Sequence, residues 1–294
     1  MDGPSVQIQI ILKDGNVRQV ERMLASLEQA VMLSRDVFQH VGIYMSDCSK
    51  AQVLSVSEID ALRKKYRSLD IQYKFSSTST KARLYNLAAQ NSPFTYLVLC
   101  STVTVFPPAF LLSLPGWFTD KQTACVEVRT IPWDNSSHFD SSSRKAIFFT
   151  DNCTVFRRDV FHAVGGFDDQ HFPSYRYTAD LSIRLLREGY QILYISDISV
   201  FQEAIPEYPE YGADDKKEST SLSDTIEDLS LLYKYDCQEE LEHLLAAYKM
   251  SPLLGEVSIY QQFEKQMSEN LLPLPVTGIS EDLQHHICTL CSVH

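Results

Sequence analysis

The chain has 294 residues, of which 44% are hydrophobic and 22% are charged, and its formal net charge at pH 7 is −12. This length and apolar content are sufficient for one sizeable core with or without a helical appendage, and they exclude a disordered chain. The acidic balance argues against a nucleic-acid partner and against an electrostatic hold on anionic lipid, because both require clustered Lys and Arg.

The sequence also bears on the compartment. No run of 18 apolar residues occurs, so we expect no transmembrane segment. The first residues contain no basic region and lead directly into an apolar pattern, which is not typical of a signal peptide. The seven cysteines are an odd number, and without a signal they favour reduced thiols and a cytoplasmic location.

Strand and helix patterns alternate through the first hundred residues. Val6, Ile8, Ile10 and Leu12 share one face of a predicted strand over 5–12, with Ile11 on the other face. Further patterns predict strands at 41–45, 71–75 and 94–100, and helices at 17–35, 57–66 and 81–91. Such alternation is typical of an α/β fold with a doubly wound, mainly parallel sheet and helices on both faces. Ligands bind such sheets beyond the carboxyl ends of the strands.

The second half predicts a different organisation. The patterns indicate a short helix over 107–118 and extended segments over 125–131, 146–156 and 191–200. Residues 203–224 lack periodicity and are rich in Pro, Tyr, Asp, Lys and Ser, which is typical of a linker or mobile loop. Apolar residues at steps of three and four then predict one helix over 226–248. We therefore expect an α/β domain over 4–205, a linker over 206–225 and a helical C-terminal region over 226–294.

The most informative stretch runs from Thr154 to Asp169 and reads TVFRRDVFHAVGGFDD, and DLSIRLLREGY begins at Asp180. This succession of apolar strand, two arginines, helical turn, GGFD and D-L-x-x-R-L-x-x-x-G resembles the acceptor half of nucleotide-sugar glycosyltransferases of the family-2 type, whose fold is called GT-A. The resemblance implies transfer of a sugar from a nucleotide sugar to the hydroxyl of a glycan or other acceptor, as in polysaccharide biosynthesis. It also implies that the turn of Gly165, Gly166 and Phe167 floors the acceptor site, although glycines there equally satisfy a tight backbone turn.

The resemblance assigns two donor-site residues in the first half of the chain. Asp47 stands at the strand end where the family uses an Asp to bind the nucleotide base, and the alternative is a turn-forming Asp. Arg83 stands in a helix whose N-terminus would favour an anion, so it could reach the diphosphate; the alternative is a surface Arg.

The metal-binding positions of the family are replaced. Ser101, Thr102 and Val103 stand where Asp-x-Asp normally holds Mg²⁺ or Mn²⁺, and Gln202 stands where a metal-binding His usually follows a strand. Hydroxyls and a valine do not bind a hard divalent cation with useful affinity. We therefore expect no metal site here and weak or no metal dependence.

The catalytic acids are displaced as well. Tyr177 and Thr178 stand where the family places a Glu-Asp pair, and its Asp deprotonates the acceptor. Asp168, Asp169 and Asp180 remain as candidates for the general base. The alternative for Asp180 is an ion pair with Arg184 four residues on. Two functions thus stay open: a glycosyltransferase, or a catalytically inactive relative that binds a ligand or a protein partner, the latter through the C-terminal helices.

The C-terminus carries a cluster of metal-binding residue types. His285, His286, Cys288, Cys291 and His294 have a spacing that zinc sites use. One half-site at a chain end is weak evidence, so we place no zinc there.

Overall fold

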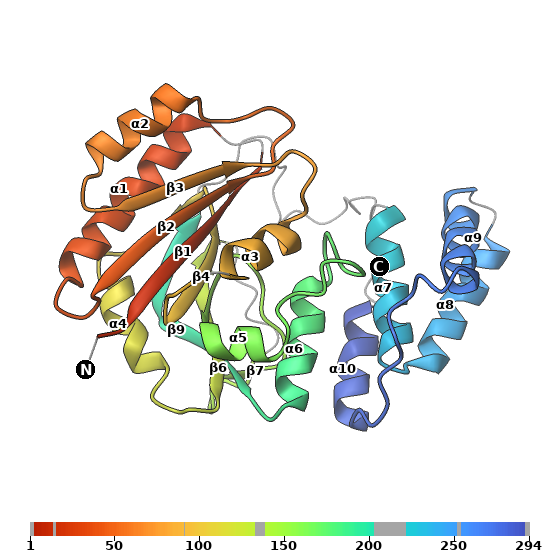
Figure 1. Ribbon diagram of the computed structural model, residues 1–294. Helices are drawn as coiled ribbons and strands as arrows, with labels where there is room; N and C mark the ends of the chain where they lie inside the picture. The colour runs from red at the N-terminus through yellow and green to blue at the C-terminus, as the bar shows by residue number, and fades with distance from the viewer. Residues whose placement is uncertain are drawn as a thin grey trace.

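The computed structural model describes residues 3–13, 16–90, 92–132, 139–202, 222–251 and 254–291. The strands are β1 (Ser5–Leu12), β2 (His40–Asp47), β3 (Asp70–Phe75), β4 (Tyr96–Ser101), β5 (Thr104–Val105), β6 (Thr123–Ile131), β7 (Lys145–Ala146), β8 (Cys153–Arg157) and β9 (Gln191–Gln202). The helices are α1 (Val17–Leu33), α2 (Val56–Lys65), α3 (Lys81–Gln90), α4 (Phe110–Trp117), α5 (Arg158–Ala163), α6 (Tyr177–Arg187), α7 (Leu222–Lys234), α8 (Gln238–Met250), α9 (Leu254–Ser268) and α10 (Glu281–Cys291). The predicted α/β class is confirmed, because the strands join in one sheet with helices on both faces (Figure 1).

The sheet has the order β3-β2-β1-β4-β8-β6-β9-β5, and β7 pairs with β9. Its first four strands are parallel, and β8 runs antiparallel to both β4 and β6. At one edge Leu12 is in register with Asp47, and Ile11 with Ser101. We call this place, where β1, β2 and β4 end, the carboxyl edge; it is where such a sheet binds ligands.

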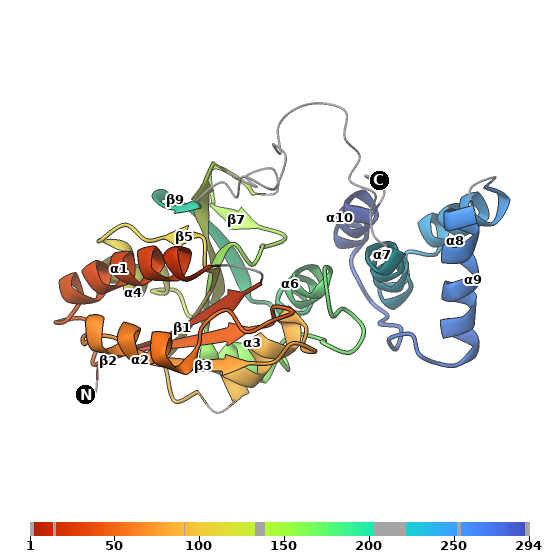
Figure 2. The same ribbon diagram turned by 90° about the horizontal axis from the view of Figure 1, so that it is seen from above.

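Two apolar layers cover the two faces of the sheet. Val6, Ile8, Ile10 and Leu12 are buried with α1, α2 and α4, whereas Ile11 is buried with α3, α5 and α6, as the alternation predicts. Figure 2 shows α1 and α3 on opposite sides of β1. Because both faces are covered, the central strand β4 is apolar and buried along nearly its whole length.

Capping explains where the first helices begin. Asn16 forms a capping box with Gln19 and starts α1 at the predicted place. The second helix begins earlier than predicted, because Ser55 rather than Ser57 is the cap and Glu58 completes its capping box.

Two predicted elements are each divided in two. The predicted strand over 146–156 is broken because Thr150 turns aside to donate its backbone N–H and hydroxyl to the Glu127 carboxylate. The predicted helix over 226–248 is broken at Asp236, whose φ of 57° lies in the left-handed region and ends the helix.

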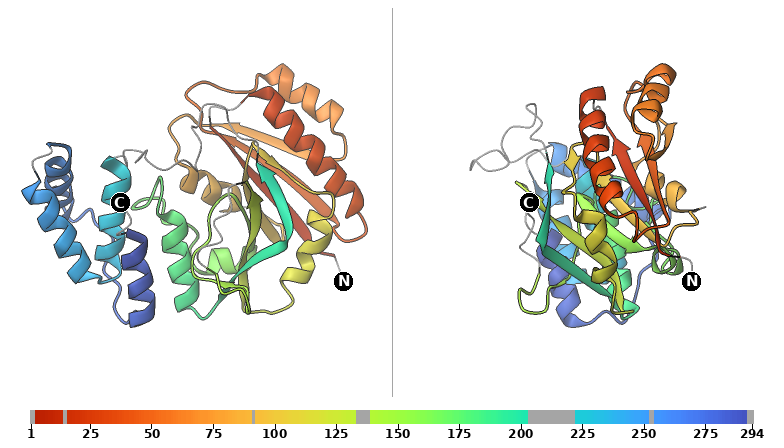
Figure 3. Two further views of the ribbon diagram at one scale, coloured as in Figure 1. Left: turned by 180° about the vertical axis from the view of Figure 1, so that it is seen from behind. Right: turned by 90° about the vertical axis from the view of Figure 1, so that its left-hand side faces the viewer.

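The C-terminal helices continue the α/β core. Helices α7 and α10 lie between α6 and the outer pair α8 and α9 (Figures 1 and 3). Leu229, Leu231 and Leu232 of α7 are fully buried in the apolar cluster that contains α6. Most of the predicted linker lies outside the described residues, and its last four positions, 222–225, already belong to α7. None of the described helices has the length and apolar composition needed to cross a membrane.

Replacing Leu232 by Ala tests whether the helices and the sheet share one core. The change should lower the free energy of unfolding by about 2–5 kcal/mol, because it leaves a cavity at a fully buried site. Leu274→Ala is the matched control, since that side chain is 85% exposed. In urea denaturation followed by fluorescence and circular dichroism, we expect one shared transition that moves only in Leu232→Ala. A separate helical transition would contradict a common core.

Candidate functional site

Of the predicted donor-site residues, Asp47 and the turn that starts at Ser101 lie at the carboxyl edge. Cys48 donates both its backbone N–H (2.9 Å) and its thiol (3.3 Å) to the Leu12 carbonyl, which fastens the end of β2 to the end of β1. Ser101 is the last residue of β4 and lies at the same edge, in register with Ile11 of β1. Residues from three separate segments of the sequence therefore surround one place.

Asp47 is fully buried at this edge. Its Oδ1 accepts from the Ser49 N–H (2.9 Å), and its Oδ2 accepts from the Val53 N–H (2.8 Å) and the Tyr73 hydroxyl. Burial and the hydrogen bond to Asp47 raise the pKa of Tyr73, so the phenol remains a donor. This arrangement is that of a turn-forming Asp. Binding of a nucleotide base by Asp47 stays a prediction. It would require one oxygen of the Asp47 carboxylate to give up a present hydrogen-bond donor and to accept from the base instead.

The two positions that the resemblance assigns to metal ligands lie next to each other. Thr104 follows the Ser101–Val103 turn and pairs with Gln202, the last residue of β9. The fold thus brings these two positions together with hydroxyl, apolar and carboxamide side chains, and their correspondence to the family's metal ligands stays a prediction.

These residues do not fit Mg²⁺ or Mn²⁺. Both cations prefer carboxylate oxygens, and Ser101, Thr102, Val103 and Gln202 supply none. Within the described ranges, no group of three or more His, Cys, Asp or Glu side chains is arranged to hold a metal, which applies also to the His and Cys residues of α10. His294 lies outside the described residues.

A carboxylate and an ammonium from other segments meet at the N-terminus of α3. Asp151 Oδ2 accepts from the Tyr177 hydroxyl (2.6 Å) and from Lys81 Nζ (3.2 Å). Burial raises the pKa of Asp151, but Lys81 and Tyr177 outweigh this and hold it below its ordinary value, so Asp151 is ionised at neutral pH. Burial and the charge of Asp151 raise the pKa of Tyr177, which stays protonated.

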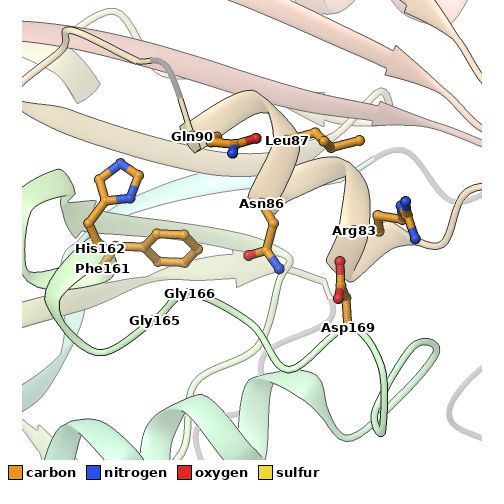
Figure 4. A pocket seen from close by; sticks show the side chains of 9 residues that line it. All are labelled: Arg83, Asn86, Leu87, Gln90, Phe161, His162, Gly165, Gly166 and Asp169. Carbon is orange, nitrogen blue, oxygen red and sulfur yellow. The ribbon is translucent and has the colours of Figure 1, made fainter.

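Arg83, by contrast, is exposed on the outer face of α3. Residues two positions apart in a helix lie about 200° apart around its axis, so Lys81 and Arg83 point in different directions. Arg83 lines a pocket of about 430 Å³ between α3 and the GGFD turn, whose walls are Arg83, Asn86, Leu87, Gln90, Phe161, His162, Gly165, Gly166 and Asp169 (Figure 4). A role of Arg83 at the diphosphate stays a prediction.

The GGFD turn is held by side chains on both sides. Gly165 and Gly166 have φ angles of 87° and 67°, and a Cβ on Gly166 would lie 2.7 Å from Asn86 Oδ1. Asn86 donates to the Phe167 carbonyl (2.8 Å) and accepts from its N–H (2.9 Å). Arg184 donates to the carbonyls of Val164 (2.6 Å) and Gly166 (2.7 Å). Glycine at 166 is thus required by conformation and space, while an acceptor site above this turn stays a prediction.

Asp180 is fully buried and its oxygens are occupied. Oδ2 accepts from Arg184 Nε (2.8 Å), and Oδ1 accepts from Lys234 Nζ (2.6 Å) and the Tyr235 hydroxyl (2.8 Å). The geometry therefore supports the ion pair with Arg184 rather than the general base. A carboxylate with no exposed surface and three donors is poorly placed to take a proton from an acceptor.

The other two candidate acids differ from each other. Asp168 accepts from His171 Nδ1 (2.9 Å) and Lys234 Nζ (2.9 Å). Burial raises its pKa, but these contacts outweigh burial and hold the pKa below its ordinary value. Asp169 is partly exposed and lines the pocket below Arg83 (Figure 4). Only Asp169 of the three candidates borders this pocket.

Helix α7 supplies contacts that the sequence does not reveal. The Glu227 carboxylate accepts the backbone N–H groups of Ser174 (3.0 Å), Tyr175 (2.9 Å) and Arg176 (2.9 Å), immediately before α6. The Arg176 guanidinium forms a buried ion pair with Asp228. In the sequence, a charged residue within an apolar helical pattern, such as Lys234, is the one signal that could have indicated that charged side chains of α7 are buried.

No profile of a known protein family matches the chain, and no curated protein sequence matches it. Solved structures do match. A mannosyltransferase, PcManGT from Pyrobaculum calidifontis, in complex with GDP-Man and Mn²⁺, has a TM-score of 0.60 and 14% identity, covering 99% of this chain and 80% of that one.

Two further structures support the same fold. GalNAc-T7 with UDP, GalNAc and Mn²⁺ has a TM-score of 0.66 and 11% identity, covering 96% of this chain and 58% of that chain. TarS 1–349 of S. aureus in complex with UDP-GlcNAc has a TM-score of 0.53 and 11% identity, covering 92% of this chain and 82% of that chain. The chain therefore has a GT-A-like glycosyltransferase fold.

Replacing Lys234 by Met tests the buried charge cluster. At pH 7 the change should lower the free energy of unfolding by about 1–3 kcal/mol, since Asp168 and Asp180 lose a shared donor. The lowered pKa of Asp168 stabilises the fold above the unfolded value of about 3.9, and this stabilisation is lost as pH falls through the lower folded value. The difference between wild type and variant should therefore shrink as the pH is lowered below about 4.

Urea titrations at several pH values measure this difference. Lys65→Met is the control, because Lys65 pairs with Glu21 on the surface. A Lys234→Met variant as stable as wild type at every pH would show that the cluster does not hold the fold together.

Proposed function

We propose that the protein is a glycosyltransferase-like protein that binds a nucleotide sugar at the carboxyl edge without a bound divalent metal. The observation that carries this proposal is the GT-A-like fold, in which the edge of β1, β2 and β4 gathers Asp47, Ser101 and Thr102. The structural neighbours were solved with GDP-Man, UDP or UDP-GlcNAc. The GGFD turn and the Asp180–Arg184 helix support the family-2 type.

Metal independence is supported by the donor set. The Ser101–Val103 turn and Gln202 offer no carboxylate where the family would place its metal ligands. Two structural neighbours were solved with Mn²⁺, so this site chemistry is where the chain departs from them.

The acids favour binding without transfer. Asp180 and Asp168 are held by Lys234 in partly or fully buried ion pairs, and Tyr177 directs its hydroxyl to Asp151. The side chains that the sequence offers as general bases are thus mostly engaged in holding the acceptor half together. A protein partner at the C-terminal helices stays a prediction.

Transfer to an acceptor hydroxyl is the second candidate function. One observation supports it: Asp169 is partly exposed beside the GGFD turn, in the pocket that Asn86 and Gly166 also line. If transfer occurs, Asp169 is the base that this geometry favours among the three acids.

Ligand binding is tested by thermal shift with UDP, GDP, UDP-GlcNAc and GDP-mannose, with EDTA or with Mn²⁺. A ligand at 100 times its Kd should stabilise the fold by about 2.7 kcal/mol. We expect one of these nucleotides to raise Tm equally with and without Mn²⁺. No shift at millimolar concentration would refute the donor site. Much tighter binding with Mn²⁺ in calorimetry would instead refute metal independence and mean that other acids have taken over the metal-binding role.

Turnover is tested by release of nucleoside diphosphate from the bound nucleotide sugar, with and without a glycan panel. We expect release no faster than in the protein-free control. If release is faster, the binding-only role is wrong, and the Asn variants of the three acids decide the base. Asp169→Asn should then lower kcat by about 10²–10⁴-fold at unchanged Tm, whereas Asp180→Asn should chiefly lower Tm.

A further inference from the structure

The carboxyl edge carries a charged pair that none of the family positions predicts. Lys81 Nζ lies 3.2 Å from Asp151 Oδ2, and the two side chains are 38% and 22% exposed. Lys81 is the first residue of α3, and Asp151 lies two residues before β8. The pair therefore links the start of α3 to the segment that leads into β8.

The strand register places this pair beside the replaced metal ligands. Cys153 of β8 is opposite Cys100 of β4, and the two strands run antiparallel. The residues that precede β8 must therefore pass the end of β4, where Ser101 and Thr102 lie. Asp151 belongs to this segment, so its carboxylate lies at the carboxyl edge although it is distant in the sequence from Ser101 and Thr102.

Asp151 is itself oriented by a neighbour. Its Oδ2 also accepts from the Tyr177 hydroxyl at 2.6 Å, and Tyr177 is almost fully buried at the start of α6. The chain of contacts from Tyr177 through Asp151 to Lys81 fixes an ammonium at the edge. An exposed ion pair contributes little to stability, so stability alone does not explain a pair built on a buried tyrosine.

A second cation stands close by. Lys13 directly follows β1, and Cys48 is bonded to the Leu12 carbonyl beside it. Burial raises the pKa of the Cys48 thiol, while the positive charges of Lys13 and Lys81 both act to lower it. The edge thus carries two ammonium groups beside the Asp151 and Asp47 carboxylates, although the expected metal ligands are absent from it.

We propose that Lys81, held in place by Asp151, binds the diphosphate of the nucleotide sugar and supplies the positive charge that a divalent metal supplies in the family. Lys13 adds to the field from the end of β1. The ligand class is a nucleoside diphosphate or its sugar ester, because two ammonium groups match a diphosphate better than a single phosphate. This inference rests on the proposed function and names the groups of that same site.

Calorimetry with UDP, UMP, GDP and GMP in EDTA tests the inference. Wild type should bind one of the diphosphates more tightly than its monophosphate. Lys81→Met should weaken binding of that diphosphate by about 10- to 100-fold and remove the preference over the monophosphate. Lys81→Arg keeps the charge and should retain most of the affinity.

Two further variants keep the result interpretable. The double variant Lys81→Met with Asp151→Asn leaves no unpaired carboxylate, so it should fold even if Lys81→Met does not, and should show the same loss. Lys65→Met, on α2 and paired with Glu21, is the matched control and should bind like wild type.

The outcomes separate the two proposals. If wild type binds none of the four nucleotides and none of the nucleotide sugars, the proposed function fails and this inference with it. If wild type binds a diphosphate and the double variant binds it equally well, Lys81 is not the diphosphate ligand, while the proposed function stands.

Discussion

The part of the fold around the GGFD turn and α6 depends on one buried carboxylate, that of Asp180. Taking a carboxylate out of water is costly unless its lone pairs are satisfied. Here Arg184 of the same helix and the consecutive residues Lys234 and Tyr235 at the end of α7 all donate to it. Arg184 continues to the carbonyls of the GGFD turn, and Lys234 continues to Asp168. One polar cluster therefore holds the turn, α6 and α7 together.

The same cluster explains why the C-terminal helices are part of the structure. Glu227 accepts the three N–H groups that precede α6, and Asp228 pairs with Arg176. The N–H groups at the start of a helix have no partner within it, and a carboxylate at this end also interacts favourably with the positive end of the helix dipole. Helix α7 thus holds the start of α6, and α8 and α9 lie farther from α6 (Figure 1).

This use of charge has a consequence for chemistry. A carboxylate held by buried cations stabilises the fold, but it is a poor proton acceptor for a substrate. Asp168 is the last residue of the GGFD turn and Asp180 is connected to that turn through Arg184, yet both carboxylates pair with Lys234. At the carboxyl edge the charged pair is instead Lys81 with Asp151, and it is partly exposed. Under our proposal, the buried cluster around Asp180 stabilises the fold, whereas Lys81 binds a ligand.

Local patterns determined much of the fold. The strand over Ser5–Leu12, the helix from Val17 and the glycines of the GGFD turn follow from alternation, apolar spacing and backbone freedom, all of which act within a few residues. The ion pair of Asp180 with Arg184 was foreseeable for the same reason, because residues four apart in a helix are neighbours.

Tertiary structure alone decided the remaining partners. Lys234 is 54 residues from Asp180, and Asp151 is 70 residues from Lys81, so no local spacing connects them. The breaks at Thr150 and Asp236 had the same origin, since Thr150 bonds to Glu127 on another strand and the turn at Asp236 lets α8 leave the core. The sequence by itself determined which segments are strands, helices and turns. Packing determined which charged groups stabilise the fold and which remain accessible to a ligand, because this depends on contacts that form only when distant segments meet.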